Sequence, residues 1–267
     1  MRHQPAAIVA AVSVVGALAA APSPRPASAT ALLAGARQLV LVTTAGWNDV
    51  SGTVHAFERD GAGAWIEARR RTGRTTAPVA AGVSIVVGKN GVAWDPGVVA
   101  PVAGPVKAEG DGRSPAGVFA LGTAFGFAPA AEAAWLRLPY VEVSPGLECV
   151  DDTASARYNE LVDRASSEDT WTSSEKMREI SPAYHWGVVV EYNTRPVVPG
   201  RGSCIFLHIG GEGGRGTAGC TAMTESALTG LMRWLDPARQ PVLVQLPREA
   251  LAALRTAWSL PALPAAR

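Results

Sequence analysis

Residues 204–211 read CIFLHIGG and residues 217–221 read TAGCT, with a glycine-rich loop between them. The first stretch is apolar and rich in β-branched and aromatic residues, which predicts a buried strand with His208 at its end. Cys220 follows the loop, which contains five glycines between positions 210 and 216. Such a loop can fold back and bring the thiol beside the imidazole, which is the arrangement of an activated cysteine nucleophile.

The composition of the chain is that of a globular protein with a full core. It has 267 residues, 48% of them hydrophobic, and a formal net charge of only +1. This length allows one large or two modest domains. Because lysine and arginine are scattered and form no basic block, the composition gives no support for a nucleic-acid or membrane-surface partner.

The first 29 residues have the pattern of a secretory signal peptide. A short basic start precedes an alanine- and valine-rich stretch over residues 5–21, and residues 27–29 read ASA, as at a cleavage site. An uncleaved anchor is disfavoured, because the apolar stretch is shorter than the ~20 residues of a spanning helix and runs into prolines. We predict cleavage near Ala29 and export of residues 30–267 to the periplasm or cell wall as a single domain, with no membrane span after cleavage.

Three cysteines in an exported chain leave one without a disulfide partner. Cys204 and His208 share a face of the predicted strand but lie roughly 13 Å apart, at ~3.3 Å per residue. They cannot bind one metal ion together, so we predict no metal site. The economical assignment is a disulfide between Cys149 and Cys204, which leaves Cys220 as the free thiol.

Strand patterns dominate the rest of the chain, so the predicted fold is mainly β with a few short helices. Short apolar or alternating runs between turn residues predict strands over residues 38–43, 53–58, 64–69, 83–87, 92–94, 117–121, 140–143, 185–192, 203–209 and 241–246. Apolar residues at helical spacing predict a helix over 225–235, and a short closing helix follows over 248–258. Residues 151–174 are polar, and we predict a long surface excursion there, of a kind that tends to be functional.

The position of Cys220 before the predicted helix favours a nucleophilic role over that of an inert buried thiol. We expect Cys220 in the turn that leads into the helix, where the helix N-terminus and His208 both favour the thiolate. Gly219 permits this turn, and the backbone N–H groups of Cys220 and Thr221 can face a developing oxyanion. His185 is the rival base, or else a residue of the cleft wall.

The segment from His208 to Met223 resembles the active-site signature of the L,D-transpeptidase family, the YkuD-type catalytic domain of bacterial cell-wall enzymes. Two further segments are similar to this family: residues 87–94, VGKNGVAW, and residues 109–119, EGDGRSPAGVF, which resembles the family's Thr-Pro-x-Gly strand entry. The match spans most of residues 80–247. The order of histidine, glycine loop, cysteine and helix also excludes a papain-like arrangement, in which the cysteine precedes the histidine.

The resemblance implies a β-sandwich-like catalytic domain and a cysteine acyl-enzyme mechanism that needs no cofactor. By analogy, Cys220 attacks a peptidoglycan stem peptide, expels the terminal D-alanine and passes the acyl group to an amine of a second stem peptide. His208 is then the base. Thr217 occupies the Ser/Thr position of the family motif, and Gly219 occupies its glycine position.

Two positions depart from the family pattern. Ala218 stands where many members carry a second histidine, and Ala222 stands where they carry an arginine. The predicted substrate-binding residues are Thr221, His185, Arg215 and Arg113, the two arginines as anchors for a substrate carboxylate. Two alternatives to a transpeptidase stay open: an L,D-carboxypeptidase, in which water accepts the acyl group, and a non-catalytic wall-binding domain on the same scaffold.

Overall fold

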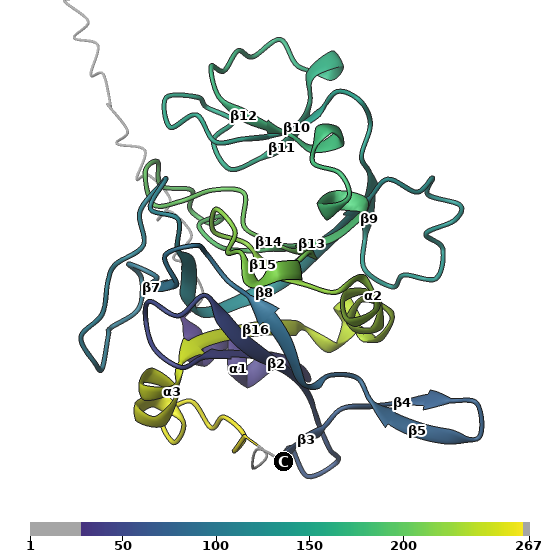
Figure 1. The fold of residues 1–267 in the computed structure, drawn as a ribbon, viewed down its shortest axis with the longest axis vertical. Coiled ribbons are helices and arrows are strands. Elements are labelled where there is room, and N and C mark those ends of the chain that lie inside the picture. The colour runs from purple at the N-terminus through teal and green to yellow at the C-terminus, as the bar shows by residue number, and fades with distance from the viewer. Residues whose placement is uncertain (1–27, 264–267) are drawn as a thin grey trace, which may run out of the picture.

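The computed structural model describes residues 28–263 (Figure 1). Most of the predicted signal segment, residues 1–27, therefore lies outside the described residues, as do residues 264–267. Its last residue, Ala29, begins helix α1 (Ala29–Gly35), and the Ser28 hydroxyl caps this helix by accepting a hydrogen bond from the Ala31 N–H at 3.2 Å. Between residues 28 and 263, no helix is long and apolar enough to cross a membrane.

Eight strands form a closed barrel. Their order is β1, β16, β8, β13, β14, β15, β6 and β2, and β2 pairs with β1 to close the ring. Their bounds are β1 Gln38–Thr44, β2 Ser51–Arg59, β6 Ala81–Val86, β8 Ser114–Gly126, β13 Trp186–Val190, β14 Phe206–Ile209, β15 Thr221–Met223 and β16 Pro241–Pro247. Two neighbouring pairs, β1 with β16 and β14 with β15, are parallel, and the other pairs of the ring are antiparallel.

The barrel core is continuous with the helices packed against it. Every residue of β1 and β16 is buried, as expected for strands built around the continuous apolar runs at residues 39–42 and 241–244. Helix α3 (Arg248–Leu254) contacts β16 and β1, and α1 contacts β8. Helix α2 (Glu225–Trp234) contacts β13 and β14 through an apolar face that includes the fully buried Leu228 and Leu231. The predicted helix over 225–235 is thereby confirmed.

The predicted surface excursion is wrong in one respect, because residues 151–174 contribute to a second, three-stranded sheet. Its order is β11 (Leu161–Asp163), β10 (Leu147–Val150) and β12 (Ser174–Lys176). Glu148 organises its interior: the carboxylate accepts hydrogen bonds from the Trp171 indole N–H and the Ser174 hydroxyl, both at 2.6 Å. In Figure 1 this sheet lies above β13, β14 and β15. The sequence did not predict this sheet, because hydrogen bonds rather than an apolar run stabilise it.

The remaining strands are short. They are β3 (Trp65–Glu67), β4 (Arg69–Thr72), β5 (Thr75–Pro78), β7 (Val92–Trp94) and β9 (Tyr140–Glu142). β4 and β5 form a hairpin that projects from the barrel (Figure 1). The mainly β prediction is confirmed. The principal sheet closes on itself as a barrel, so the sandwich-like form of that prediction is not confirmed.

Candidate functional site

Cys220 and His208 belong to two neighbouring parallel strands. His208 lies in β14, and Cys220 immediately precedes β15. In the register of this pair, Leu207 is opposite Thr221 and His208 is opposite Ala222. Because side chains alternate along a strand, Cys220 faces the same side of the sheet as Ala222 and His208. The glycine-rich loop therefore returns the thiol to the face of the imidazole, one diagonal step away.

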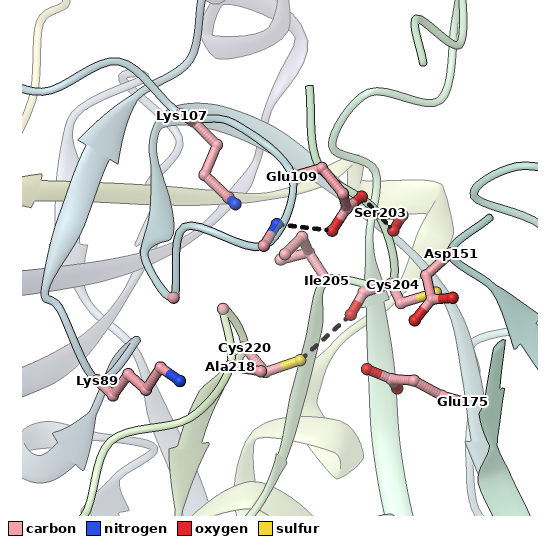
Figure 2. Close-up of a pocket in the computed structure, with 13 residues that line it drawn as sticks. Lys89, Lys107, Glu109, Asp151, Glu175, Ser203, Cys204, Ile205, Ala218 and Cys220 are labelled. Carbon is pink, nitrogen blue, oxygen red and sulfur yellow. Dashed lines mark hydrogen bonds between the residues drawn. The ribbon is translucent and has the colours of Figure 1, made fainter. Parts of the chain in front are cut away.

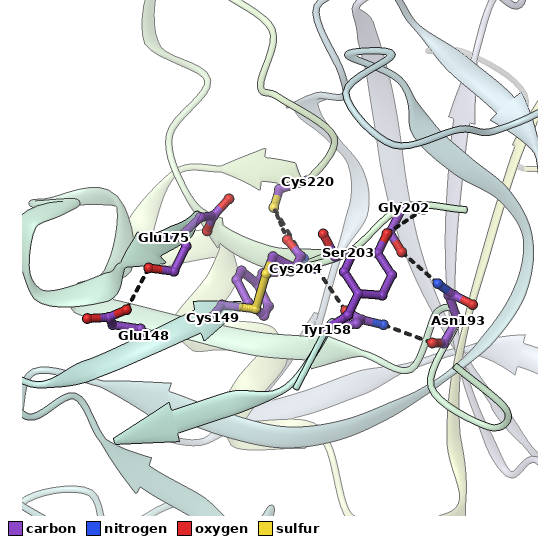
Figure 3. The surroundings of a disulfide bond; sticks show 12 residues. Glu148, Cys149, Tyr158, Glu175, Asn193, Gly202, Ser203, Cys204 and Cys220 are labelled. Carbon is purple, nitrogen blue, oxygen red and sulfur yellow. Dashed lines mark hydrogen bonds between the residues drawn. A yellow bond between two sulfur atoms is a disulfide. The ribbon is translucent and has the colours of Figure 1, made fainter. Parts of the chain in front are cut away.

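The Cys220 thiol is held by backbone groups of the neighbouring strand segment. Its sulfur accepts a hydrogen bond from the Phe206 N–H at 3.3 Å, and the thiol donates to the Cys204 carbonyl, also at 3.3 Å (Figures 2 and 3). The Cys220 carbonyl accepts hydrogen bonds from the hydroxyls of Thr217, at 2.6 Å, and Ser114, at 2.9 Å. Both the side chain and the backbone of Cys220 are thus fixed before any substrate arrives.

Burial changes the chemistry expected of this thiol. Cys220 is 5% exposed, and desolvation, reinforced by the charge of Glu175, raises the pKa of its thiol far above the ordinary value. The sequence predicts that a helix N-terminus favours the thiolate, but β15 separates Cys220 from α2, which begins at Glu225. This prediction is therefore corrected. The resting form is the neutral thiol, and a base must take its proton during attack.

His208 is positioned as a neutral base. Its Nδ1 donates to the Ile209 carbonyl at 2.8 Å, which leaves Nε2 free to accept a proton. Desolvation lowers the pKa of His208, so the ring is uncharged near neutral pH. Among the described residues no hydrogen bond joins His208 to Cys220. The His208 ring instead meets the edge of Tyr184, with ring centroids 5.5 Å apart.

Cys220 lies at the junction of two cavities. The smaller one, which we call the charged cavity, has a volume of about 200 Å³, and its charged lining residues are Lys89, Lys107, Glu109, Asp151 and Glu175. The larger one, which we call the large cavity, has a volume of about 610 Å³, and its lining includes Val86, Ile180, Tyr184, His208, Ile209, Arg215 and Ala222. Figure 2 shows the Cys220 sulfur between the two lysines on one side and Asp151 and Glu175 on the other. Across the described part of the chain, no three His, Cys, Asp or Glu side chains are grouped as metal ligands.

No family model, curated protein or solved structure matches the chain. The structure brings Thr217, Gly219 and Arg215 to the site. The Thr217 hydroxyl accepts a hydrogen bond from the Gly219 N–H at 3.1 Å while it donates to the Cys220 carbonyl, which locks the turn before the thiol. A Cβ atom on Gly219 would lie only 3.2 Å from the Arg113 carbonyl, and this close approach accounts for the glycine. Arg215 is exposed and lines the large cavity.

Three of the predicted substrate-binding residues lie outside the lining of both cavities. Thr221 is 2% exposed, and its hydroxyl donates to the Gln245 side-chain oxygen at 2.6 Å on the opposite face of the sheet from Cys220. His185 pairs with the Ser181 hydroxyl at 3.0 Å. Arg113 donates to two backbone carbonyls, each at 3.1 Å, and so supports the scaffold. The structure therefore places Thr221, His185 and Arg113 away from the two cavities beside Cys220, and their substrate-binding roles stay predictions.

Two residues of the site, Tyr184 and Glu175, escaped the sequence reasoning. Tyr184 lies in the short 3₁₀ helix η3 (Ala183–His185), and its hydroxyl donates to a Glu175 carboxylate oxygen at 2.5 Å. Tyr184 lines the large cavity together with Cys220, and burial, reinforced by the charges of Cys220 and Glu175, raises the pKa of its hydroxyl. Glu175 belongs to β12 and lines both cavities. The nearest feature in the sequence is His185, the predicted rival base, but its neighbour Tyr184 is the residue that lines the large cavity.

The environment of Glu175 keeps its carboxyl near its titration point at neutral pH. Desolvation raises the pKa of Glu175 to about 7, and the charges of Asp151 and Glu109 act in the same direction. The hydrogen bond from Tyr184 opposes this rise without cancelling it. A carboxyl with such a pKa can both accept and release a proton at physiological pH.

The predicted disulfide between Cys149 and Cys204 is present and joins the second sheet to the site (Figure 3). Cys149 is opposite Glu175 in the register of β10 and β12. Cys204 in turn accepts the hydrogen bond of the Cys220 thiol through its carbonyl. The bridge therefore ties β10, the neighbour of the strand that carries Glu175, to the residue whose carbonyl accepts the hydrogen bond of the free thiol.

The two departures from the family pattern both face the large cavity. Ala218 is exposed and lines both cavities, while Ala222 is 1% exposed and lies opposite His208 in the strand register. Methyl groups at these positions leave the space beside Cys220 without the ring and the charge that the pattern would supply. The polar side chains that shift the pKa of the Cys220 thiol belong instead to Glu175, Tyr184 and Lys107.

Proposed function

We propose that the chain is an exported peptidoglycan L,D-transpeptidase that acts in the periplasm or cell wall with Cys220 as its nucleophile. The observation that carries the proposal is a free thiol at the junction of two cavities, on the same sheet face as a neutral histidine. Two cavities suit two substrates, a donor and an acceptor stem peptide, better than hydrolysis of one. The proposal includes the fold, with residues 80–247 as a catalytic domain of the β-sandwich-like kind expected for this family.

In the proposed reaction the Cys220 sulfur attacks the carbonyl of the third residue of a stem tetrapeptide. As the S–C bond forms, the thiol proton passes to a base; as the C–N bond to the terminal D-alanine breaks, the base returns that proton to the leaving amine. An amine of a second stem peptide then attacks the thioester, which forms the new amide and restores the thiol. In this scheme Nε2 of His208 is the base, because Nδ1 is committed to the Ile209 carbonyl.

Intact-protein mass spectrometry with a carbapenem tests the nucleophile. We expect the protein to gain the mass of one carbapenem, with the adduct on Cys220 after digestion. Cys220→Ala should form no adduct and should fold normally, because the change removes only a thiol whose partners are backbone groups. A wild-type protein that forms no adduct, although Cys220 is shown to be free and reduced, would favour the wall-binding domain instead.

Product analysis with a stem tetrapeptide separates transfer from hydrolysis. Release of D-alanine together with a cross-linked or amine-exchanged product supports the transpeptidase, whereas a tripeptide as the sole product indicates the L,D-carboxypeptidase. His208→Ala should slow acylation strongly, since Nε2 is then lost. Turnover at the wild-type rate in His208→Ala would remove His208 from the mechanism.

A further inference from the structure

The residue that accepts the hydrogen bond of the Cys220 thiol has an unusual backbone conformation. Cys204 has a φ of 55°, in the left-handed region that residues with a side chain rarely adopt. Its carbonyl accepts from the thiol at 3.3 Å, and two residues later the Phe206 N–H donates to the same sulfur at 3.3 Å. Because the backbone angles of Cys204 set the direction of its carbonyl and of the chain that follows, they also set where the sulfur is held.

A left-handed conformation at a residue with a side chain persists only where neighbouring groups fix it. Two groups from the second sheet fix Cys204. The disulfide to Cys149 in β10 holds its side chain, and the side-chain oxygen of Asn159 accepts a hydrogen bond from its N–H at 2.9 Å. Figure 3 shows Cys204 joined to Cys149 on one side and to Cys220 on the other. Asn159 and the disulfide therefore constrain the same residue from two directions.

Asn159 is itself firmly placed. It lies between β10 and β11, and its N–H donates to the Val150 carbonyl at 2.7 Å. Its side-chain amide donates to the carbonyls of Tyr192 and Asn193, at 3.0 and 2.9 Å. Asn159 is not among the described residues that line the two cavities, so it can affect the site only through Cys204. These contacts are those of a side chain that orients a backbone segment rather than a substrate.

We propose that Asn159 is a positioning residue for Cys220, which holds Cys204 in the left-handed conformation that fixes the sulfur at the junction of the two cavities. The proposal rests on the nucleophilic role proposed for Cys220. During attack the thiol S–H turns from the Cys204 carbonyl to Nε2 of His208; the S–H bond breaks and an N–H bond forms as the sulfur bonds to the substrate carbonyl. The Phe206 N–H still donates to the sulfur, so the geometry of attack is set before substrate arrives.

The chain offers a matched control in Asn193. Asn193 has a φ of 53° and Asn159 a φ of 65°, so glycine is compatible with the backbone at both positions. The Asn193 side chain makes three hydrogen bonds, two with Val198 and one with the Gly202 carbonyl, and Asn159 also makes three. Only Asn159→Gly removes the acceptor of the Cys204 N–H. Asn159→Asp keeps this acceptor and loses the two donated hydrogen bonds.

The S–H stretching band in the infrared spectrum is the first test, because it needs no substrate. Of the three cysteines in the chain only Cys220 is free, so Cys220→Ala should abolish the band. The band lies at lower frequency when the thiol donates a hydrogen bond. We expect Asn159→Gly to move it up toward the frequency of a free thiol, whereas Asn159→Asp and Asn193→Gly keep the wild-type position. An unshifted band in Asn159→Gly, or an equal shift in Asn193→Gly, would overturn the proposal.

Asn159→Ser serves the same test if Asn159→Gly does not fold. The serine oxygen is one bond closer to the backbone, so it cannot reach the Cys204 N–H, while a polar side chain is kept. We expect Asn159→Ser to shift the S–H band upward as well. A wild-type band position in folded Asn159→Ser would contradict the role of the Asn159 oxygen.

Acylation by a carbapenem is the second test, measured as the maximal rate and the half-saturating concentration. We expect Asn159→Gly to lower the maximal rate about tenfold, because the sulfur leaves its attacking geometry. The half-saturating concentration should stay within about twofold of the wild type, since Asn159 lines neither cavity. Asn159→Asp and Asn193→Gly should keep the wild-type rate even where they lose stability. Equal rates in Asn159→Gly and Asn193→Gly would overturn the proposal.

The two measurements separate failure of this role from failure of the proposed function. An upward shift of the S–H band in Asn159→Gly, in a protein that forms no carbapenem adduct, would defeat the transpeptidase and leave the placement of the sulfur by Asn159 standing. A wild-type adduct on Cys220, with the band and the acylation rate unchanged in Asn159→Gly, would do the reverse.

Discussion

The two cavities beside Cys220 differ in origin as well as in size. The large cavity, of about 610 Å³, takes most of its lining from residues 208–225, which the motif in the sequence already connects, and the rest from Val86, Glu175 and residues 180–184. The charged cavity, of about 200 Å³, draws Asp151 and Glu175 from the second sheet or its end and Lys107 and Glu109 from a loop near β8. The lining of the large cavity is therefore mostly local in sequence, whereas that of the charged cavity is assembled over long distances.

The barrel and the second sheet contribute different chemical groups to the site. The barrel supplies the thiol and the imidazole, and the second sheet supplies the carboxyl whose pKa lies near 7. Only Cys220, Glu175 and Ala218 line both cavities among the described residues. Changes to the second sheet should therefore alter protonation at the site, while changes to the loop should alter access to it.

Removal of the disulfide should have the largest effect on the charged cavity. In the double variant Cys149→Ala with Cys204→Ala, we expect the free energy of unfolding to fall by roughly 4 kcal/mol, because the bridge spans a separation of 55 residues. Denaturant titration measures this loss, and the double variant avoids a stray thiol. We also expect slower carbapenem acylation, since the strand of Glu175 loses its anchor. Wild-type acylation in a folded double variant would show that the second sheet keeps its position without the bridge.

Glu175→Gln should change how stability depends on pH. The ordinary pKa of this carboxyl is 4.5 and its pKa in the folded protein is about 7, so the folded state binds more protons between these values. Wild-type stability should therefore fall as the pH rises from 4.5 to 7 and level off above 7. We expect Glu175→Gln to gain on the wild type by on the order of 3 kcal/mol across this window. Thermal or denaturant unfolding at pH 4.5, 6 and 8 measures it, with the exposed Glu179→Gln as control; a constant difference across these pH values would contradict the raised pKa.

Ala218→Leu should obstruct access to Cys220 at the point where the large cavity meets the charged cavity. Ala218 is exposed and lies where the two cavities meet, so a larger side chain should obstruct both without disturbing the core. We expect stability to stay within about 0.5 kcal/mol of the wild type. Carbapenem acylation should fall about tenfold, as expected when a reactant is displaced from its attacking geometry. Ala253→Leu, an exposed change on α3, is the control, and equal acylation rates in the two variants would mean that substrate does not pass Ala218.

The strands and their order of appearance could be read from the sequence because each is an apolar or alternating run next to turn residues. Residues 92–94 form β7 as predicted, whereas the predicted run over 64–69 divides between β3 and β4. Closure of the sheet by pairing of β1 with β2 could not be predicted, because the sequence of one strand does not identify the strand that it pairs with. Residues 151–174 were mistaken for an excursion, since their packing depends on the buried Tyr158 and Trp171 and on the Glu148 carboxylate rather than on a periodic pattern.

By itself the sequence determined that His208 and Cys220 flank the glycine-rich loop, that Cys220 is free and that Cys149 and Cys204 form the disulfide, because strand period, loop composition and cysteine count are local properties. Only the tertiary structure decided that the thiol is neutral, that Thr221, His185 and Arg113 lie outside the lining of both cavities, and that Tyr184 and Glu175 line the large cavity with Cys220. Protonation follows from desolvation and from neighbouring charges, and these depend on which distant segments cover a group. The sequence alone does not show which distant segments will bury a given group in the folded protein.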